Sequence, residues 1–289
     1  MSLLSRLQKE KSLSEISTFG IGGKARLFIE IHTVEEMLAI YQYIRKEDLP
    51  FFVVGKGSNS LFDDRGFDGL IISNNINFIN LNKGEVFVGA GYSFSLLGVK
   101  TARKGWMGLE FASGIPGSVG GAIFMNAGAN GMETKDYLTQ VGFIDEQGVY
   151  VEKNKEELEF SYRNSSFQRM KSIIVSGKFL LEESVDVRQK QISIVNYRIK
   201  TQPYKEKSAG CVFRNPKKES AGALIEKCGL KGISIGGAKI STTHANFIIN
   251  QGNARARDVL DLIDYVKQEI KEKTGEELEI EIRYIPYHI

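Results

Sequence analysis

The chain has 289 residues, of which 42% are hydrophobic and 25% are charged, as in a globular protein long enough for two or three domains. Its 38 basic and 35 acidic residues leave a formal net charge of +3, and no basic run is interleaved with aromatic residues, which argues against a nucleic-acid-binding protein. No stretch of about 18 apolar residues occurs, which argues against a membrane span.

Cysteine usage and the first residues indicate the compartment. Cys211 and Cys228 give neither a disulfide framework nor the spacing of a metal site, and Cys228 reads as an apolar filler on a helix face. The first fifteen residues lack the apolar core of a signal peptide. We therefore expect a cytoplasmic protein without a metal.

The first part of the chain predicts strands and helices in an α+β order. A strand at 26–31 precedes a helix that Thr33 caps, with Glu36 placed for a capping box. The apolar face of this helix is expected to hold Val34, Met37, Leu38 and Tyr41. Further strands are predicted at 51–54, 69–72, 85–90, 141–151 with a turn near Gly148, and 173–182, and a short helix at 93–104.

The last third contains three predicted helices and a final strand. A charged helix over 187–201 ends before Pro203, and we place a domain boundary in this region. Helices follow at 221–228 and 253–273, the second capped by Asn253 and ended by Gly275. Its buried stripe is expected to hold Val259, Leu262, Ile263, Val266 and Ile270. The strand 278–285 alternates, with Leu278, Ile280, Ile282 and Tyr284 on one face and Glu279, Glu281 and Arg283 on the other.

Two glycine-rich segments indicate a bound ligand. In Phe111–Gly128 four glycines are placed to form a nest of backbone N–H groups for a pyrophosphate: Gly114, Gly117, Gly120 and Gly121. The alternative interpretation is a tight, buried crossing of two backbones. Upstream of this segment, Phe51–Asp64 runs from a buried strand into another glycine loop, the first along the chain, and neither segment matches a Rossmann or P-loop fingerprint. Two such loops suggest one long ligand held at two points.

Seven motifs, in order along nearly the whole chain, resemble UDP-N-acetylenolpyruvoylglucosamine reductase. They are TFGIGGKA (18–25), VVGKGSN (53–59), GIPGSVGGAIFMNAG (114–128), YRNS (162–165), AGCVFRNP (209–216), HANFIINQG (244–252) and EIEIRYI (279–285). The short connection between Phe167 and Ile173 resembles the form of the family that lacks an extra tyrosine-bearing loop.

The resemblance implies a fold, an activity and partners. It implies an FAD-binding PCMH-type fold, like that of vanillyl-alcohol oxidase, over residues 1–185 (subdomains about 1–68 and 69–185), and an α+β substrate-binding domain over 186–289. The implied reaction is the NADPH-dependent, FAD-mediated reduction of UDP-N-acetylglucosamine enolpyruvate to UDP-N-acetylmuramate in peptidoglycan synthesis. A monomer with this small-molecule substrate, no nucleic acid and no membrane is expected.

The resemblance also carries over site residues. The implied FAD contacts are Val54, Gly55, Lys56, Gly57, Ser58, Asn59, Gly114, Pro116, Gly117, Val119, Gly120, Gly121 and Asn126. The implied substrate contacts are Tyr162, Arg163, Tyr204, Arg214 and Asn215. Lys56 stands where the family usually has glycine, and Arg214 stands where lysine is common.

Three residues are implied to carry the chemistry: Arg163, Cys211 and Glu281. A guanidinium suits a developing carboxylate charge because its planar donors stay cationic. Glu281 is implied to assist near the enolate. Cys211 replaces the serine that is usual in the family, and a thiol with a reference pKa of about 8.5 gives up its proton more readily than a hydroxyl does, so the acid role is preserved.

Two other functions remain open at this point. The first is an oxidase or dehydrogenase of alcohols or sugars with the same flavin fold, which the matches in the C-terminal part disfavour. The second is a non-catalytic nucleotide-binding protein, which the retention of both Arg163 and Glu281 disfavours.

Overall fold

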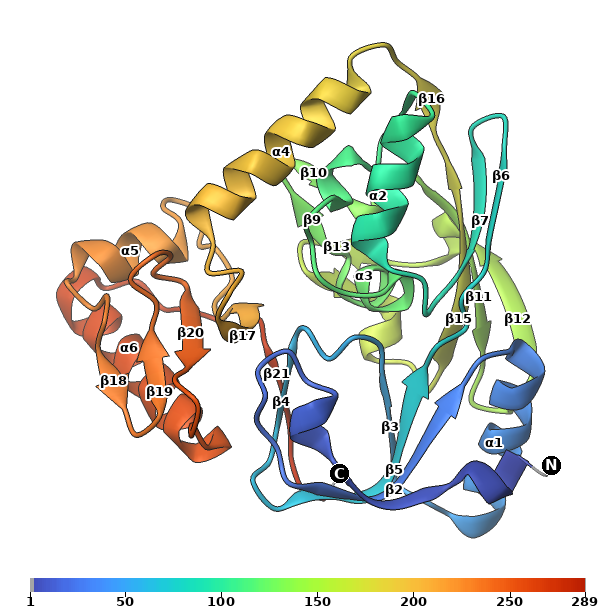
Figure 1. The fold of residues 1–289 in the computed structure, drawn as a ribbon, viewed down its shortest axis with the longest axis horizontal. Coiled ribbons are helices and arrows are strands. Elements are labelled where there is room, and N and C mark those ends of the chain that lie inside the picture. Colours follow the sequence, from blue (N-terminus) through green and yellow to red (C-terminus); the bar gives the residue numbers. More distant parts are fainter. Residues whose placement is uncertain (1–2, 289) are drawn as a thin grey trace. The chain divides into compact units, whose positions relative to one another are not determined.

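The computed structural model, which describes residues 3–288, contains the α+β mixture that the sequence predicts (Figure 1). Its helices are α1 (Val34–Glu47), α2 (Phe94–Arg103), α3 (Val119–Met125), α4 (Val187–Thr201), α5 (Ala221–Lys227) and α6 (Ala256–Thr274). Strands β1 (Gln8–Ser12), β2 (Lys24–Ile31), β5 (Gly66–Asn74) and β3 (Phe51–Val54) form one sheet, in the order β1-β2-β5-β3.

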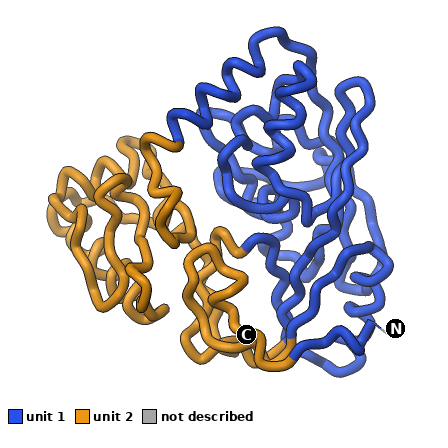
Figure 2. Tube along the Cα trace, viewed as in Figure 1, with its two compact units in different colours: residues 1–8, 28–56, 70–198 blue, residues 9–27, 57–69, 199–289 orange. Residues whose placement is uncertain are grey.

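The chain divides into two compact units, each made of several stretches (Figure 2). Unit 1 comprises residues 1–8, 28–56 and 70–198, and unit 2 comprises residues 9–27, 57–69 and 199–289. The predicted domain boundaries near residues 68 and 185 stay predictions.

A five-stranded antiparallel sheet forms the centre of unit 1. Its strand order is β12 (Tyr150–Asn154), β11 (Leu138–Ile144), β15 (Ile173–Leu180), β7 (Glu85–Gly89) and β6 (Ile79–Asn82). Val141 lies opposite Gly177, and Ser176 lies opposite Gly89. Gly177 leaves room for Ile123 of α3, since an added Cβ would lie 2.8 Å from the Ile123 Cδ1. The glycine-rich segment is therefore packed directly on the sheet.

The short elements of unit 1 complete its fold. They are η1 (Leu3–Arg6), β8 (Trp106–Met107), η3 (Glu110–Ala112), β9 (Gly128–Ala129), β10 (Met132–Glu133), η4 (Thr134–Asp136), η5 (Lys155–Glu157), β13 (Phe160–Ser161), β14 (Asn164–Ser165), η6 (Ser166–Gln168) and β16 (Glu182–Glu183). Five fully buried phenylalanines dominate the core: Phe94, Phe111, Phe143, Phe167 and Phe179.

The predicted start of α1 is confirmed, although its hydrogen bonds differ from the expected ones. The Thr33 hydroxyl accepts a hydrogen bond from the Glu36 N–H at 3.1 Å. The Glu36 carboxylate accepts from the His32 N–H and not from the N–H of Thr33, so the capping box is incomplete. The buried face holds Met37, Ile40, Tyr41 and Ile44, whereas Val34 and Leu38 are only half-buried.

Unit 2 packs two helices against a second antiparallel sheet. The sheet order is β17 (Lys207–Cys211), β20 (Phe247–Asn250), β19 (Ala238–Ile240) and β18 (Ser234–Ile235). Helix α6 contacts β18 and β19, and it buries the whole predicted stripe. The remaining elements are η2 (Leu13–Glu15), β4 (Ser60–Phe62) and β21 (Arg283–Ile285), and β21 pairs with β4 in parallel.

Two sequence predictions for unit 2 are wrong. Asn253 does not cap α6, whose N-cap residue is Arg255. The predicted strand 278–285 is regular only over Arg283–Ile285, and Ile280 and Tyr284 are exposed. Upstream of β21 the segment forms only an isolated antiparallel bridge, between Phe213 and Ile280.

Candidate active site

The two glycine-rich segments meet where β3 ends. Gly55 follows β3 directly and lies against Ser118, so that an added Cβ at Gly55 would overlap the Ser118 hydroxyl. Ser118 in turn caps α3 by accepting a hydrogen bond from the Gly121 N–H at 3.3 Å. Only glycine fits at position 55, because any side chain would displace this cap.

The predicted nest of four glycine N–H groups does not form. The N–H of Gly114 donates to the Ser95 hydroxyl at 2.8 Å, and the N–H of Gly120 donates to the Ala90 carbonyl at 2.8 Å. An added Cβ at Gly120 would lie 2.9 Å from that of Ala90. The prediction is wrong because this part of the segment is a close crossing of two backbones, which was the alternative interpretation. Val119, buried in the core, belongs to the same crossing.

The first turn of the segment retains the features of a ligand-binding loop. Gly114 and Gly117 have φ of +84° and +147°, and Pro116 between them is exposed. The hydroxyls of Tyr92 and Ser113 are buried without a hydrogen-bond partner among residues 3–288. Backbone that admits no side chain, beside unused hydrogen-bonding capacity, fits a large polar cofactor such as FAD.

Asn126, a predicted cofactor contact, is engaged within the protein. Its side chain is buried at the end of α3, where its amide donates to the Glu133 carboxylate at 3.0 Å and to the Ser161 carbonyl at 2.9 Å. The amide oxygen accepts from the Lys135 N–H at 3.1 Å. Both amide hydrogens therefore serve to tie α3 to its neighbours in unit 1.

Arg163 lies at the tip of a tight hairpin in unit 1. Strands β13 and β14 pair Ser161 with Asn164, so Tyr162 and Arg163 form the two-residue turn. Arg163 has φ of +55°, and its guanidinium donates to the Gly128 carbonyl at 3.0 Å and lies 4.9 Å from the Tyr162 ring centroid. Tyr162 is 44% exposed. The hairpin presents a cation and an aromatic ring together.

Cys211 ends β17 in unit 2 and is half-buried. Gly210 before it has φ of +80°, and the pairing with β20 is irregular between Ser208 and Cys211. A bulge of this kind redirects a side chain out of the regular alternation. The thiol position is thus set by a local distortion that glycine makes possible.

Glu281 belongs to a segment that runs beside the residues after Cys211. The Glu281 N–H donates to the Val212 carbonyl at 2.8 Å, and the Arg214 N–H donates to the Glu279 carbonyl at 2.8 Å. The Glu281 carbonyl accepts from the Asn59 amide at 3.2 Å. Unit 2 therefore joins two of the predicted reaction residues through one ladder, and Asn59 of the first glycine loop holds its end.

The first glycine loop is divided between the two units. Val54, Gly55 and the exposed Lys56 belong to unit 1, and Gly57 begins the next stretch of unit 2. Gly57 has φ of +62°, and the Thr18 N–H donates to its carbonyl at 3.3 Å. The Thr18 hydroxyl donates to the Ser208 carbonyl in β17 at 2.7 Å, which links the loop to the strand of Cys211.

The predicted substrate residues of unit 2 differ in their surroundings. Tyr204 is exposed, and the Asn215 amide oxygen accepts from the Ala221 N–H at 3.1 Å, at the start of α5. Arg214 donates to Glu279 at 3.2 Å, while its Nε is buried without a partner among residues 3–288. Arg214 therefore keeps a donor available inside the protein.

Two residues with structural roles at the site were missed from the sequence. The buried Asn246 pairs with the backbone of Phe213 in both directions, at 2.9 Å and 2.8 Å, and so fixes the segment after Cys211. Gln168 donates to the Arg163 carbonyl at 3.0 Å. Asn246 lies within the HANFIINQG motif but acts on Phe213, 33 positions away, and Gln168, five positions after Arg163, lies in none of the seven motifs.

A charged cluster of Asp63, Arg65 and Tyr284 holds β21, the strand that follows Glu281. The Asp63 carboxylate accepts from Arg65 and from the Tyr284 hydroxyl, the latter at 2.6 Å. The hydrogen bonds from Arg65 hold the pKa of Asp63 well below its usual range. Partial loss of solvent around its hydroxyl, together with the hydrogen bond to Asp63, raises the pKa of Tyr284 to about 12. The cluster is ionised at Asp63 and neutral at Tyr284 over the whole physiological range.

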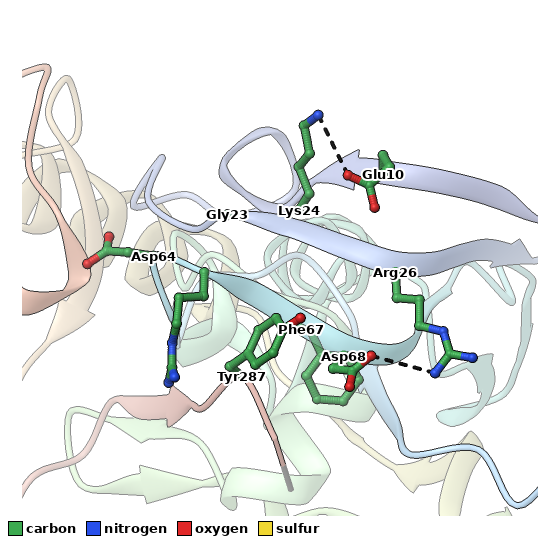
Figure 3. A pocket seen from close by; sticks show the side chains of 9 residues that line it. Glu10, Gly23, Lys24, Arg26, Asp64, Phe67, Asp68 and Tyr287 are labelled. Atoms are coloured by element: carbon green, nitrogen blue, oxygen red, sulfur yellow. Dashed lines mark ion pairs between the residues drawn. The ribbon is translucent and has the colours of Figure 1, made fainter.

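An open pocket of about 550 Å³ lies elsewhere in unit 2 and contains none of the predicted site residues (Figure 3). Lys24 points toward Glu10 at 3.7 Å, and Arg26 points toward Asp68 at 3.6 Å. These cations are matched by carboxylates, so the pocket has no excess charge to attract an ionic ligand.

Within residues 3–288 no helix has both the length and the apolar composition needed to cross a bilayer. The same residues contain no group of three or more His, Cys, Asp or Glu side chains placed to hold a metal ion.

Comparison with known proteins agrees with this architecture. Residues 25–153 match the model of an FAD binding domain, and residues 202–285 match that of the UDP-N-acetylenolpyruvoylglucosamine reductase C-terminal domain. The fold and these two matches define an FAD-dependent oxidoreductase, and the predicted fold class is confirmed.

Similar proteins cover the whole chain. The UDP-N-acetylenolpyruvoylglucosamine reductase of Protochlamydia amoebophila is 58% identical over 100% of this chain and 97% of its own length. That of Chlamydia trachomatis serovar A is 46% identical over 98% and 97%. The crystal structure of the Thermus caldophilus enzyme superposes with a TM-score of 0.84 at 38% identity, covering 97% of this chain and 99% of that one. The chain belongs to the UDP-N-acetylenolpyruvoylglucosamine reductase family, whose members use FAD with NADPH as the hydride donor.

Proposed function

We propose that this protein reduces UDP-N-acetylglucosamine enolpyruvate to UDP-N-acetylmuramate with NADPH, in the cytoplasm, as a step of peptidoglycan synthesis. What supports the proposal, beyond family membership, is the ladder that places Glu281 beside the strand of Cys211. A non-catalytic nucleotide-binding protein has no need of an acid and a carboxylate held in one register.

The cofactor is proposed to lie along the two glycine loops, from Val54 to Asn59 and from Ser113 to Gly117. When bound, FAD supplies the hydride that it has taken from NADPH. Tyr92 and Ser113 offer buried hydroxyls without protein partners to such a group. Lys56, exposed on the first loop, offers a positive charge to a phosphate.

Arg163, Cys211 and Glu281 are proposed to manage the charge and the proton. The double bond gains a hydride at its terminal carbon, and negative charge then accumulates on the substrate carboxylate. The Arg163 guanidinium stabilises that charge, and Glu281 orients the reacting group by hydrogen bonding. The Cys211 thiol gives its proton to the α carbon, and the resulting thiolate regains a proton from water.

The first test is anaerobic NADPH oxidation by the FAD-loaded protein, with and without the enolpyruvyl substrate. Multiple turnovers are expected only with substrate. Cys211→Ala is expected to lower substrate reduction by about 10²–10⁴-fold, the usual contribution of a positioned acid, with flavin reduction by NADPH unchanged. Cys228→Ala is the matched control. Flavin reduction without turnover in the wild type would contradict the proposed acceptor, and full activity of Cys211→Ala would contradict the proposed acid.

A further inference from the structure

Arg163 has a backbone conformation that residues with a side chain rarely adopt. Its φ of +55° lies in the left-handed region, where a residue with a side chain is strained. Such a conformation persists only where the surrounding structure holds it. Glycine would accept this turn without strain but has no guanidinium.

One side chain bonds directly to the strained peptide. The Gln168 amide nitrogen donates to the Arg163 carbonyl at 3.0 Å and to the Phe124 carbonyl of α3, also at 3.0 Å. An amide nitrogen has two hydrogens, so these two bonds use both of them. Gln168 thus links the tip of the hairpin to the helix of the glycine-rich segment.

Other bonds hold the hairpin, but they act on its strands. The Ser165 hydroxyl donates to the Phe124 carbonyl at 2.6 Å, and the Asn126 amide donates to the Ser161 carbonyl at 2.9 Å. These contacts fix where the hairpin lies. Of the side-chain hydrogen bonds made by Ser165, Asn126 and Gln168, only that of Gln168 reaches the peptide of Arg163.

We propose that Gln168 is a positioning residue for Arg163. Its amide holds the Arg163 carbonyl, maintains the left-handed turn and so directs the guanidinium toward the substrate carboxylate. Gln168 acts through Arg163 and not on the substrate. The inference rests on the role of Arg163 in the proposed function.

A double-mutant cycle in the FAD-loaded enzyme tests this role. Gln168→Leu removes both donors at similar size. It is expected to lower kcat/KM for the enolpyruvyl substrate about 10–100-fold, because a small misplacement of a catalytic group has effects of this order. Flavin reduction by NADPH should not change. In an Arg163→Ala background, Gln168→Leu should have no further effect on kcat/KM, since residues acting as one unit are not additive.

The control is Tyr41→Phe, which also removes a side-chain donor to a backbone carbonyl, that of Glu146 at 3.2 Å. This change in α1 should alter neither half-reaction. Thermal melts of all variants verify folding, and Gln168→Glu, which keeps the size but loses the donors, is measured if the leucine variant does not fold.

The outcomes separate the two proposals. An unchanged kcat/KM in Gln168→Leu, or an equal loss with and without Arg163, would overturn the positioning role while leaving the proposed function intact. A wild-type enzyme that does not turn over the substrate would overturn the proposed function, and the role of Gln168 with it.

Discussion

The stability of unit 2 is expected to depend on the ionisation of Asp63. Its carboxylate is 8% exposed and accepts hydrogen bonds from Arg65 and Tyr284. Because the folded-state pKa is lowered, the stabilisation is present above the unfolded pKa of about 4 and is lost as the pH falls below it. For Tyr284 the folded pKa is raised, so stability is lost as the pH rises from about 10 to about 12.

Replacing Asp63 tests this dependence. Asp63→Asn is expected to lower the free energy of unfolding at pH 7 by about 1.5–3 kcal/mol, the value of a hydrogen bond to a charged group, and to flatten the loss of stability below pH 4. Urea unfolding between pH 3 and pH 7 measures both. Asp261→Asn, which breaks an exposed pair with Arg257, should cost less than about 0.5 kcal/mol. Similar acid profiles for Asp63→Asn and the wild type would refute the assignment.

At the scale of elements, the N-terminus of α6 is capped from a distant loop. The Asp64 carboxylate accepts hydrogen bonds from the N–H groups of Ala256 at 2.7 Å and Arg257 at 3.2 Å. A carboxylate here satisfies two unpaired donors and opposes the positive end of the helix dipole. The cap also joins the end of the segment Phe51–Asp64 to the C-terminal helix of unit 2.

The contact of Asp64 with α6 predicts a loss of stability that local sequence rules do not predict. Asp64→Ala is expected to lower the free energy of unfolding by about 1–2 kcal/mol, as for lost helix caps elsewhere. Asn253→Ala, at the cap position that the sequence predicts, should be nearly neutral. Thermal unfolding of both variants decides the matter, and a larger loss from Asn253→Ala would contradict the structure.

Elements with a strong internal pattern are the ones that the sequence predicts well. The stripe of α6 is buried as expected, because five apolar residues at helical spacing can face only one side. The strand predicted at 278–285 is regular only over Arg283–Ile285, because the segment changes its partner: Ile280 forms an isolated antiparallel bridge with Phe213, whereas β21 pairs with β4 in parallel. The sequence of a strand does not show which other segment it will pair with.

At the scale of the whole molecule, the cofactor is expected to contribute to stability. FAD that binds only the folded chain at 100 times its Kd adds about 2.7 kcal/mol, which raises Tm by several degrees at about 2–4 °C per kcal/mol. Differential scanning calorimetry of the apoprotein with and without FAD measures the shift. Riboflavin, which lacks the diphosphate and adenosine, is the control, and an equal shift with both would argue against two loops sharing one long ligand.

Local periodicity and motifs in a fixed order are enough to predict the α+β class, the main helices and the family from the sequence. The candidate site residues follow from the same motifs, and their roles stay predictions. The acceptors of the glycine N–H groups, the distant carboxylate that caps α6 and the side chain that holds the Arg163 turn are known only from the folded structure. Asp64 and Ala256 are 192 positions apart, and no local pattern relates residues that meet only when the chain is folded.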